Sequence, residues 1–253
     1  MFTRERRCVA MEKGTMMRGI FITGSDTGVG KTHVGTALAR LLAQRGLRVC
    51  PRKPVESGCV RDGDRLLPQD AAVLREAAGS TEPLERVCPY RLEAPISPER
   101  AAALEGLPLN LEHLLIACRA GVTAADFLLV EGAGGFCSPL VVDGLNADLA
   151  VALGLPVVLV TADRLGALHQ ALVTAEAIER RGLRLAGVVL NRLAEGADAR
   201  MDNAADLARW LGREVIVVPH GRTRDPSTWR EIGPGLAGLA DRLACDRAEK
   251  ERE

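Results

Sequence analysis

The sequence predicts an α/β fold: a single domain with a mostly parallel β-sheet flanked by helices on both faces. Three observations predict it. Short runs rich in Val, Leu and Ile alternate along the chain with longer stretches of helical periodicity. Several of these runs lack polar alternation, which is typical of strands buried on both faces. The 253 residues suffice for one large domain, and no internal repeat or low-complexity linker divides them.

The apolar runs and the periodic stretches give the expected elements in order. Strands are expected at residues 19–23, 47–50, 127–131, 157–161, 187–191 and 215–218. Helices are expected at residues 32–45, 69–78, 98–104, 111–120, 147–153, 167–181, 201–211 and 232–243. Because a helix follows each strand, the crossovers should be right-handed and the strands mostly parallel.

Composition argues against several classes of function. The 33 basic and 33 acidic residues cancel, and no basic stripe interleaved with aromatic residues occurs, so we expect no nucleic-acid partner. No apolar stretch reaches membrane-spanning length, so we expect no membrane association. The seven cysteines lack C-x-x-C spacing, which argues against a zinc site. Their odd number, without a secretory signal, predicts free thiols in a reducing cytoplasm.

The two ends of the chain differ from the rest. Residues 1–16 are polar and charged, and we expect them to form a disordered extension. Residues 246–253 are also rich in charge, and we expect them to form a solvated tail. The compact domain is therefore expected to span residues 17–245.

A glycine-rich turn separates the first expected strand from the first helix. It reads Gly24-Ser25-Asp26-Thr27-Gly28-Val29-Gly30-Lys31-Thr32. Between a strand and a helix, this spelling predicts a P-loop, in which backbone N–H groups and the helix N-terminus bind phosphate. Lys31 would reach the β- and γ-phosphates, and the Thr32 hydroxyl would bind Mg²⁺. Ser25 stands where the usual pattern has its first glycine, so a helix that merely begins with Gly-Lys-Thr is the alternative interpretation.

Polar and glycine-rich residues follow the other expected strands too. In open parallel sheets, ligands bind outside the carboxyl ends of the strands. The segments at these positions are Lys53-Pro54-Val55-Glu56-Ser57-Gly58, Glu131-Gly132-Ala133-Gly134-Gly135, Asp163 with Arg164 and Gly166, Asn191, and Pro219-His220. They predict one ligand site at this edge of the sheet.

Two carboxylates are candidates for a magnesium site beside the P-loop. Glu131 ends an apolar strand and is followed by glycines that let the backbone approach phosphate. Asp70 begins an expected helix, where the helix dipole alone would also favour an acid. With Thr32 they make an oxygen ligand set of the kind that Mg²⁺ prefers. Lys53 could neutralise a transferring phosphoryl group, although a surface lysine would fit the sequence equally well.

Together these motifs resemble the dethiobiotin synthetases. The resemblance rests on the P-loop spelling, Lys-Pro-Val-Glu-Ser-Gly from Lys53, the Gln69-Asp70-Ala71 helix start, Pro89-Tyr90 with Ser97-Pro98, and Val130-Glu131-Gly132-Ala133-Gly134-Gly135. Their order and spacing match the family from about residue 20 to residue 191. The last quarter of the chain matches poorly.

The resemblance implies a P-loop NTPase-like fold and a ligase of biotin biosynthesis. In the family's reaction, 7,8-diaminononanoate takes up CO₂ as a carbamate on one amine. ATP phosphorylates the carbamate to a mixed carbamic–phosphoric anhydride, with Mg²⁺ as cofactor. The second amine then closes the ring, giving dethiobiotin and phosphate. This is the penultimate step of biotin synthesis.

The resemblance also implies roles for charged residues. Lys31 would contact the phosphates, and Lys53 would contact the carbamate and the γ-phosphate, which makes both catalytic. Thr32, Asp70 and Glu131 would hold Mg²⁺. Because the carbamate and the γ-phosphate are both anionic, concentrated positive charge is what their reaction requires.

The remaining implied roles concern nucleotide and substrate. Asn191 would recognise the adenine edge, because an amide both donates and accepts hydrogen bonds, and Ser57 would orient the substrate. The expected nucleotide site comprises Gly28, Val29, Gly30, Lys31, Thr32, His33, Asp70, Glu131, Gly132, Ala133, Gly134 and Asn191. His33 also fits a packed position inside the helix.

The family's homodimer implies that the substrate site lies at the subunit interface, with Thr27 and Ser57 from one subunit and Gly166, Ala167 and Leu168 receiving the substrate carboxylate.

Two departures and two alternatives accompany the resemblance. Ser25 replaces a threonine and keeps its hydroxyl, while Gly28 stands where many members carry glutamate, which leaves nucleotide selectivity open.

A partitioning or septum-placement ATPase switch would carry an extra P-loop lysine, and none lies between Gly19 and Gly30. A cobyrinate-type amide synthetase would need a glutaminase domain, for which the chain has no room.

Overall fold

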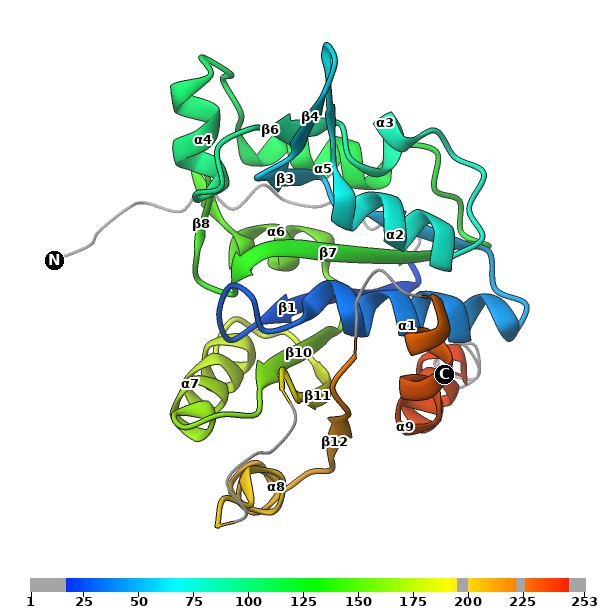
Figure 1. Ribbon diagram of the computed structural model, residues 1–253, viewed down its shortest axis with the longest axis vertical. Coiled ribbons are helices and arrows are strands. Elements are labelled where there is room, and N and C mark those ends of the chain that lie inside the picture. The colour runs from blue at the N-terminus through cyan, green and yellow to red at the C-terminus, as the bar shows by residue number, and fades with distance from the viewer. Residues whose placement is uncertain (1–16, 195–199, 222–225, 246–253) are drawn as a thin grey trace, which may run out of the picture.

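A six-stranded parallel sheet forms the centre of the molecule (Figure 1). The computed structural model describes residues 17–194, 200–221 and 226–245. The sheet consists of β1 (Gly19–Gly24), β2 (Val49–Arg52), β7 (Phe127–Gly135), β10 (Val157–Ala162), β11 (Leu185–Asn191) and β12 (Val215–Val218). Their order is β12-β11-β10-β1-β7-β2, and each neighbouring pair is parallel. The parallel α/β fold predicted from the alternating pattern is confirmed.

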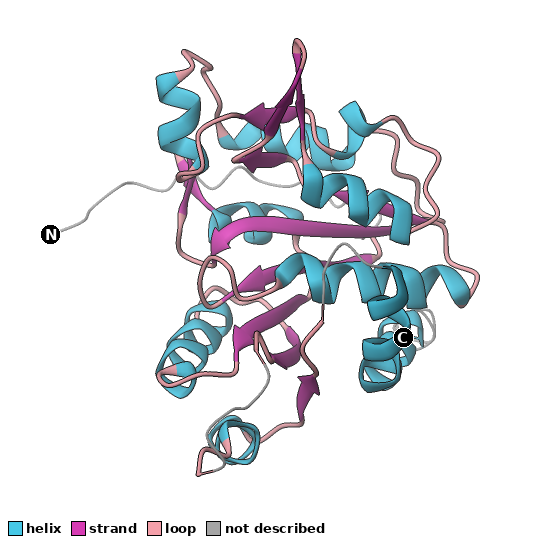
Figure 2. Cartoon of the chain, viewed as in Figure 1, coloured by secondary structure: helices cyan, strands magenta, loops and turns pink. Residues whose placement is uncertain are grey.

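Helices cover both faces of this sheet (Figure 2). One face packs against α1 (Lys31–Gln44), α2 (Gln69–Ala77) and α9 (Pro226–Cys245). The other face packs against α4 (Pro98–Leu104), α5 (Leu111–Arg119), α6 (Asn146–Leu153) and α7 (Ala167–Glu179). The remaining helices are α3 (Leu84–Val87), which lies beside α2, and α8 (Asn203–Leu211), which packs on α7.

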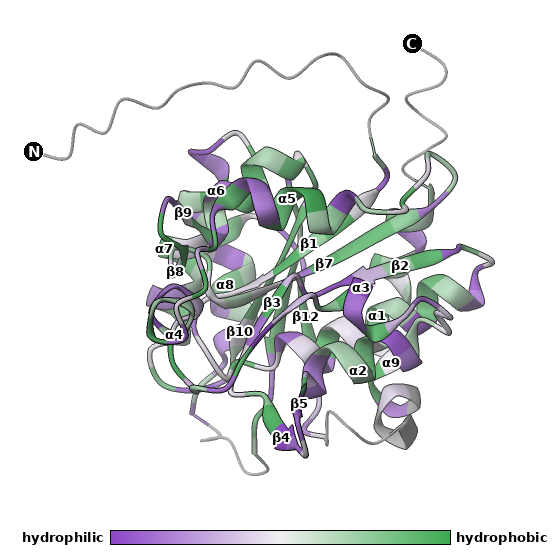
Figure 3. Ribbon diagram, turned by 90° about the horizontal axis from the view of Figure 1, so that it is seen from above, coloured by the Kyte–Doolittle hydropathy of each residue, from purple (hydrophilic) through white to green (hydrophobic). Residues whose placement is uncertain are grey.

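Alternate side chains of β1 enter two different cores. Ile20 and Ile22 pack with α1 and α9, whereas Phe21 packs on the opposite face with the helices of the other layer. All three side chains are fully buried. A strand covered on both sides has no solvent face, which explains why its sequence lacks polar alternation. The same apolar character runs through the central strands in Figure 3.

Several short elements were not expected from the sequence. They are β3 (Val55–Ser57), which pairs in parallel with β6 (Tyr90–Leu92), the hairpin of β4 (Val60–Asp62) and β5 (Arg65–Leu67), the hairpin of β8 (Pro139–Val141) and β9 (Gly144–Leu145), and α3. Each is only two to four residues long. Such lengths show neither a strand nor a helix period in a sequence.

Two boundaries differ from expectation in ways that have a physical reason. The last helix begins at Pro226, not at residue 232, because the polar sequence from 226 to 231 shows no apolar periodicity and proline is tolerated in a first helical turn. Strand β7 continues to Gly135 instead of ending at Glu131. The glycine segment is thus part of the strand. Residues 1–16 and 246–253, expected to form an extension and a tail, lie outside the described residues.

Candidate active site

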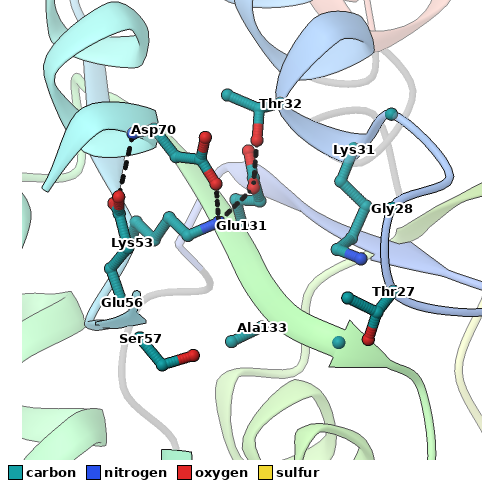
Figure 4. A pocket seen from close by; sticks show the side chains of 12 residues that line it. Thr27, Gly28, Lys31, Thr32, Lys53, Glu56, Ser57, Asp70, Glu131 and Ala133 are labelled. Atoms are coloured by element: carbon teal, nitrogen blue, oxygen red, sulfur yellow. Dashed lines mark hydrogen bonds and ion pairs between the residues drawn. The ribbon is translucent and has the colours of Figure 1, made fainter. Parts of the chain in front are cut away.

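A cavity of about 560 Å³ lies at the carboxyl ends of β1 and β7, against the N-terminus of α1 (Figure 4). The residues that line it are Thr27, Gly28, Gly30, Lys31, Thr32, Lys53, Glu56, Ser57, Asp70, Glu131, Ala133 and Gly134. The sequence had assigned all of them to a site except Glu56. Most of them follow or belong to strands that are far apart in the chain but adjacent in the sheet, because β1 pairs with β7 and β7 pairs with β2. Glu56 and Ser57 come from β3, and Asp70 comes from α2.

The glycine-rich turn between β1 and α1 forms one wall of the cavity. Gly30, the residue preceding α1, has φ of 93°, in the left-handed region that favours glycine. A Cβ at Gly30 would also lie 2.0 Å from the Asn191 amide nitrogen, so no larger residue fits. Lys31 extends across the turn and donates to the backbone oxygen of Asp26 at 3.0 Å. Burial lowers the pKa of Lys31 to about 8, and the positive charge of the neighbouring Lys53 makes a smaller contribution in the same direction.

Lys53 lies between the two candidate metal ligands. Its ammonium donates to Glu131 Oε1 at 2.5 Å and to Asp70 Oδ2 at 2.9 Å. The Thr32 hydroxyl donates to the same Glu131 oxygen at 2.8 Å. The predicted Thr32, Asp70, Glu131 and Lys53 therefore form one connected cluster (Figure 4).

Opposing effects act on the charge of Lys53. Burial disfavours its ammonium form, but the carboxylates of Glu131 and Asp70 outweigh burial and hold the pKa of Lys53 above its ordinary value. Lys53 thus stays a cation, while Lys31, with an Asp26 carbonyl and no such carboxylate pair in contact, binds its proton more weakly. The two lysines differ because of their surroundings, not their residue type.

Glu131 retains one carboxylate oxygen without a hydrogen-bond donor. Its Oε2 atom is buried and has no partner among the described residues, whereas Oε1 has two. A buried carboxylate oxygen without a donor fits a cation that the residues shown do not supply. Among the described residues, no group of three or more His, Cys, Asp or Glu side chains is arranged to bind a metal, so a site here needs the Thr32 hydroxyl with the two carboxylates.

Glu56 is the cavity residue that the sequence assigned no role. Its side chain in β3 is 5% exposed, and its two oxygens accept the backbone N–H groups of Asp70 and Ala71, both at 3.0 Å. Burial raises the pKa of Glu56, while Lys53 and these N–H groups oppose the rise. The available sequence signal was its position within the Lys-Pro-Val-Glu-Ser-Gly segment that follows the second expected strand.

The cavity lining does not include Val29, His33 or Asn191, which were predicted for the nucleotide site. Asn191, at the end of β11, donates from Nδ2 to the backbone oxygen of Val29 at 3.0 Å, and its buried Oδ1 has no partner in the described part of the chain. His33 is 2% exposed, and neither ring nitrogen has a hydrogen-bond partner among the described residues. Burial lowers the pKa of His33, and His220 makes a smaller contribution in the same direction.

The other predicted residues lie elsewhere. Gly132 is buried in β7, where a Cβ would lie 2.6 Å from Asn146 Oδ1, so this glycine serves close packing. Gly166, Ala167 and Leu168 form the start of α7 and do not line the cavity. Leu165, which precedes them, is 88% exposed. None of the described helices is long and apolar enough to cross a membrane.

Comparison with known proteins supplies a family context for this cavity. A family model described as an AAA domain matches residues 18–216. A curated relative from Anaeromyxobacter dehalogenans (strain 2CP-C), named ATP-dependent dethiobiotin synthetase BioD, is 46% identical over 203 residues, which cover 80% of this chain and 89% of the relative. A relative of the same name from Ruthia magnifica is 45% identical, over 70% of this chain and 81% of its own.

Solved structures with the same fold are more distant in sequence. A ParA family ATPase from Chlorobium tepidum gives a TM-score of 0.53 at 13% identity and covers 90% of this chain and 98% of its own. The septum site-determining protein MinD of Pyrococcus horikoshii, solved with Mg-ADP, gives 0.54 at 19% identity, covering 93% and 98%. At such identities the likeness shows the fold alone.

Proposed function

The chain belongs to the ATP-dependent dethiobiotin synthetases, and on that premise we propose how the residues of its cavity carry out the family's reaction. The reaction converts 7,8-diaminononanoate, CO₂ and ATP into dethiobiotin, ADP and phosphate. A carbamate on one amine attacks the γ-phosphate of ATP and gives a mixed carbamic–phosphoric anhydride. The second amine attacks the carbamate carbon, and phosphate leaves with the former carbamate oxygen.

The proposal rests above all on the position of Lys53. Its ammonium is buried, kept charged by Glu131 and Asp70, and lies in the same cavity as the P-loop Lys31. Bringing a carbamate against a triphosphate requires positive charge between two anions. Lys31 is proposed to bind the β- and γ-phosphates, and Lys53 to bind the carbamate and the γ-phosphate. Positioning and charge stabilisation then carry catalysis, without a protein nucleophile.

Thr32, Asp70 and Glu131 are proposed to hold Mg²⁺. The buried Glu131 Oε2 without a hydrogen-bond partner among the described residues, and the Thr32 hydroxyl beside Oε1, support this assignment. A bound Mg²⁺ would neutralise charge on the phosphate oxygens. In the structure Lys53 bridges the two carboxylates and keeps their charges paired, a role that a bound Mg²⁺ would share.

The nucleotide and substrate contacts are proposed from the same cavity. The backbone of Gly28, Val29 and Gly30 would bind the phosphates, with Ala133 and Gly134 of the cavity lining facing them from β7. Asn191, with its Oδ1 lacking a partner among the described residues, would recognise adenine, and His33 would lie near the same end of the nucleotide. Thr27 and Ser57, on opposite sides of the cavity, would contact the diamine substrate.

A homodimer is proposed as the working form. The start of α7, at Gly166, Ala167 and Leu168, lies outside the cavity of its own chain, which suits a role in a neighbouring subunit. The exposed Leu165 beside it supports a contact there. Residues 17–245 are proposed to form the one folded domain. A cytoplasmic location is likewise proposed, supported by free thiols such as those of the buried Cys88 and Cys118.

The reaction is tested by incubating the purified protein with ATP, Mg²⁺, bicarbonate and 7,8-diaminononanoate, and following ADP and dethiobiotin by mass spectrometry. We expect both products in equal amounts, and neither product when the diamine is omitted. ATP hydrolysis that ignores the diamine would contradict the proposal and favour an ATPase switch of the ParA or MinD kind. Sedimentation of the same sample tests the dimer.

A further inference from the structure

Helix α2 begins without a cap of its own. The residue before its first turn is Pro68, whose side chain cannot accept a hydrogen bond, and no side-chain cap bond forms there. The first N–H groups of a helix have no partner within the helix and need one from elsewhere. In α2 that partner comes from a different element, fourteen residues earlier in the chain.

The partner is the Glu56 carboxylate in β3. One oxygen accepts the N–H of Asp70 and the other accepts the N–H of Ala71, each at 3.0 Å. A carboxylate at a helix N-terminus also interacts favourably with the helix dipole. The side chain is 5% exposed, so water cannot readily replace it. Glu56 therefore joins β3 to the first turn of α2 by two hydrogen bonds, of which Figure 4 shows the one to Asp70.

What this contact holds in place is a residue of the active site. Asp70 presents its Oδ2 to the Lys53 ammonium at 2.9 Å. Lys53 precedes Glu56 by three residues, so the same segment supplies both the ammonium and the carboxylate that fixes the opposite side of the cavity. If the first turn of α2 frayed, Asp70 would no longer be held opposite Glu131.

We propose that Glu56 is a positioning residue, which fixes the first turn of α2 so that the Asp70 carboxylate faces Lys53 and Glu131 across the cavity. This inference rests on the proposed role of Asp70 in holding Mg²⁺. Glu56 acts through the backbone of Asp70 and Ala71 and need not touch nucleotide or metal. Partners that orient metal ligands in this way typically contribute about 10- to 100-fold to metal affinity or activity.

The test is Mg²⁺-dependent binding of ADP, measured by calorimetry, which requires no turnover. Glu56→Ala should raise the Mg²⁺ concentration that half-saturates this binding about tenfold or more. Glu56→Gln keeps one acceptor but turns an amide donor toward the second N–H, so its shift should be intermediate. Amide hydrogen exchange at the start of α2 should become faster in the same order.

A matched control is the cap of α5, where Asn110 Oδ1 accepts the N–H of His113 at 2.9 Å and no α5 residue lines the cavity. Asn110→Ala should lower the melting temperature yet leave the Mg²⁺ midpoint unchanged. An unchanged midpoint and unchanged exchange at α2 in Glu56→Ala would overturn the proposal. So would a rise confined to the KM for the diamine, because Glu56 would then be a substrate contact.

The proposed function and this inference can fail separately. If the wild-type protein forms no dethiobiotin, the assigned reaction fails, but the Mg²⁺ dependence of ADP binding still tests Glu56. Asp70→Asn, measured alongside, checks the metal assignment itself. Its Mg²⁺ midpoint should rise at least as much as that of Glu56→Ala, and exchange at α2 should change far less than in Glu56→Ala.

Discussion

Lys31 and Lys53 line the same cavity, and their neighbours shift the pKa values of the two ammonium groups in opposite directions. Lys53 contacts two carboxylates and stays charged, so it can serve as a permanent cation between two reacting anions. Lys31 has no carboxylate within hydrogen-bond distance among its described contacts, and burial lowers its pKa to about 8. Its charge in the free protein therefore depends on pH near the physiological range.

This difference predicts a pH dependence of nucleotide binding. The phosphates of ATP would raise the pKa of Lys31, so above pH 8 binding must be accompanied by proton uptake. The Kd for ATP should then rise by up to about tenfold per pH unit above pH 8 and stay nearly constant below it. Calorimetric titrations at pH 7, 8 and 9 measure this. A Lys31→Arg control, always charged, should lose the slope, and a flat wild-type profile would refute the assignment.

The metal assignment makes a prediction at Glu131. Glu131→Gln keeps the size of the side chain but removes its charge and one acceptor, so the Mg²⁺ concentration for half-maximal activity should rise about tenfold or more. Activity is measured over a Mg²⁺ titration. Glu176→Gln, which alters an exposed ion pair with Arg180, serves as the control and should behave as the wild type. An unchanged titration in Glu131→Gln would move the metal elsewhere.

At this scale the sequence predicted most cavity residues because their chemistry is local. Lys31 and Thr32 belong to a contiguous motif, and Glu131 directly follows a recognisable apolar run in β7. The role of Glu56 could not be predicted, because its partners are the backbone N–H groups of Asp70 and Ala71. Every residue except proline has a backbone N–H, so the sequence does not indicate which of them Glu56 contacts. The predicted contacts of Asn191, His33 and the start of α7 with ligands stay predictions.

Among the elements, β7 positions the site most directly, and its beginning is held by an ion pair. Asp126 precedes β7 and Arg48 precedes β2, and the two strands start in register at Val49 and Phe127. Both oxygens of Asp126 accept from the Arg48 guanidinium, and Thr123 donates to one of them through its N–H and its hydroxyl. The Asp126 side chain is 1% exposed.

Asp126 predicts how stability responds to acid. Hydrogen bonds from the Arg48 guanidinium lower the pKa of Asp126 from 3.8 to about 2. Burial opposes this decrease, and the two Thr123 donors add to it. Because this folded-state pKa is depressed, the stabilisation is complete above pH 3.8 and is lost as the pH falls through 2. After discounting for the exposed Arg48, it amounts to about 1–2 kcal/mol.

The measurement is urea unfolding of the wild type and Asp126→Asn at pH 5 and pH 2.5. The difference in unfolding free energy between the two proteins should be clear at pH 5 and shrink at pH 2.5. Asp206→Asn, which removes an exposed ion pair with Arg209, is the control and should show little difference at either pH. A difference in Asp126→Asn that does not change with pH would contradict the assigned pKa.

The sequence predicted the strands and helices that are long enough to show a periodic or continuous apolar pattern. The six main strands are four to nine residues long, and the apolar runs in the central ones, such as β1 and β10, report burial on both faces. The two- and three-residue strands give no such signal. The β4–β5 hairpin mixes apolar and charged residues and is mostly exposed, so only its backbone pairing defines it.

For the whole molecule, strand order determines which motifs meet. β1 lies between β10 and β7, and Ile22 pairs with Glu131, so the P-loop and the candidate metal ligand emerge side by side. The alternation of strands and helices predicted a parallel sheet but not this order. Order depends on which apolar faces pack together across long separations, and that information is spread over the whole chain.

The extent of the folded domain gives a prediction at the same scale. The family match begins at residue 18, so removing residues 1–16 should change neither the melting temperature nor the rate of dethiobiotin formation. Thermal unfolding and the product assay on the shortened chain measure both. A large loss in either would show that these residues contribute to the fold or the site.

The central claim is that Lys53 acts mainly in the reaction between the carbamate and the γ-phosphate and contributes little to the affinity for ATP. Its most direct test measures ATP affinity and dethiobiotin formation together in Lys53→Ala, with Arg61→Ala, which loses an exposed ion pair, as the control. A melting curve confirms that the variant folds despite the unpaired carboxylates. We expect kcat to fall by about 100- to 1000-fold while the Kd for ATP stays close to the wild-type value. Wild-type kcat in Lys53→Ala would contradict the account.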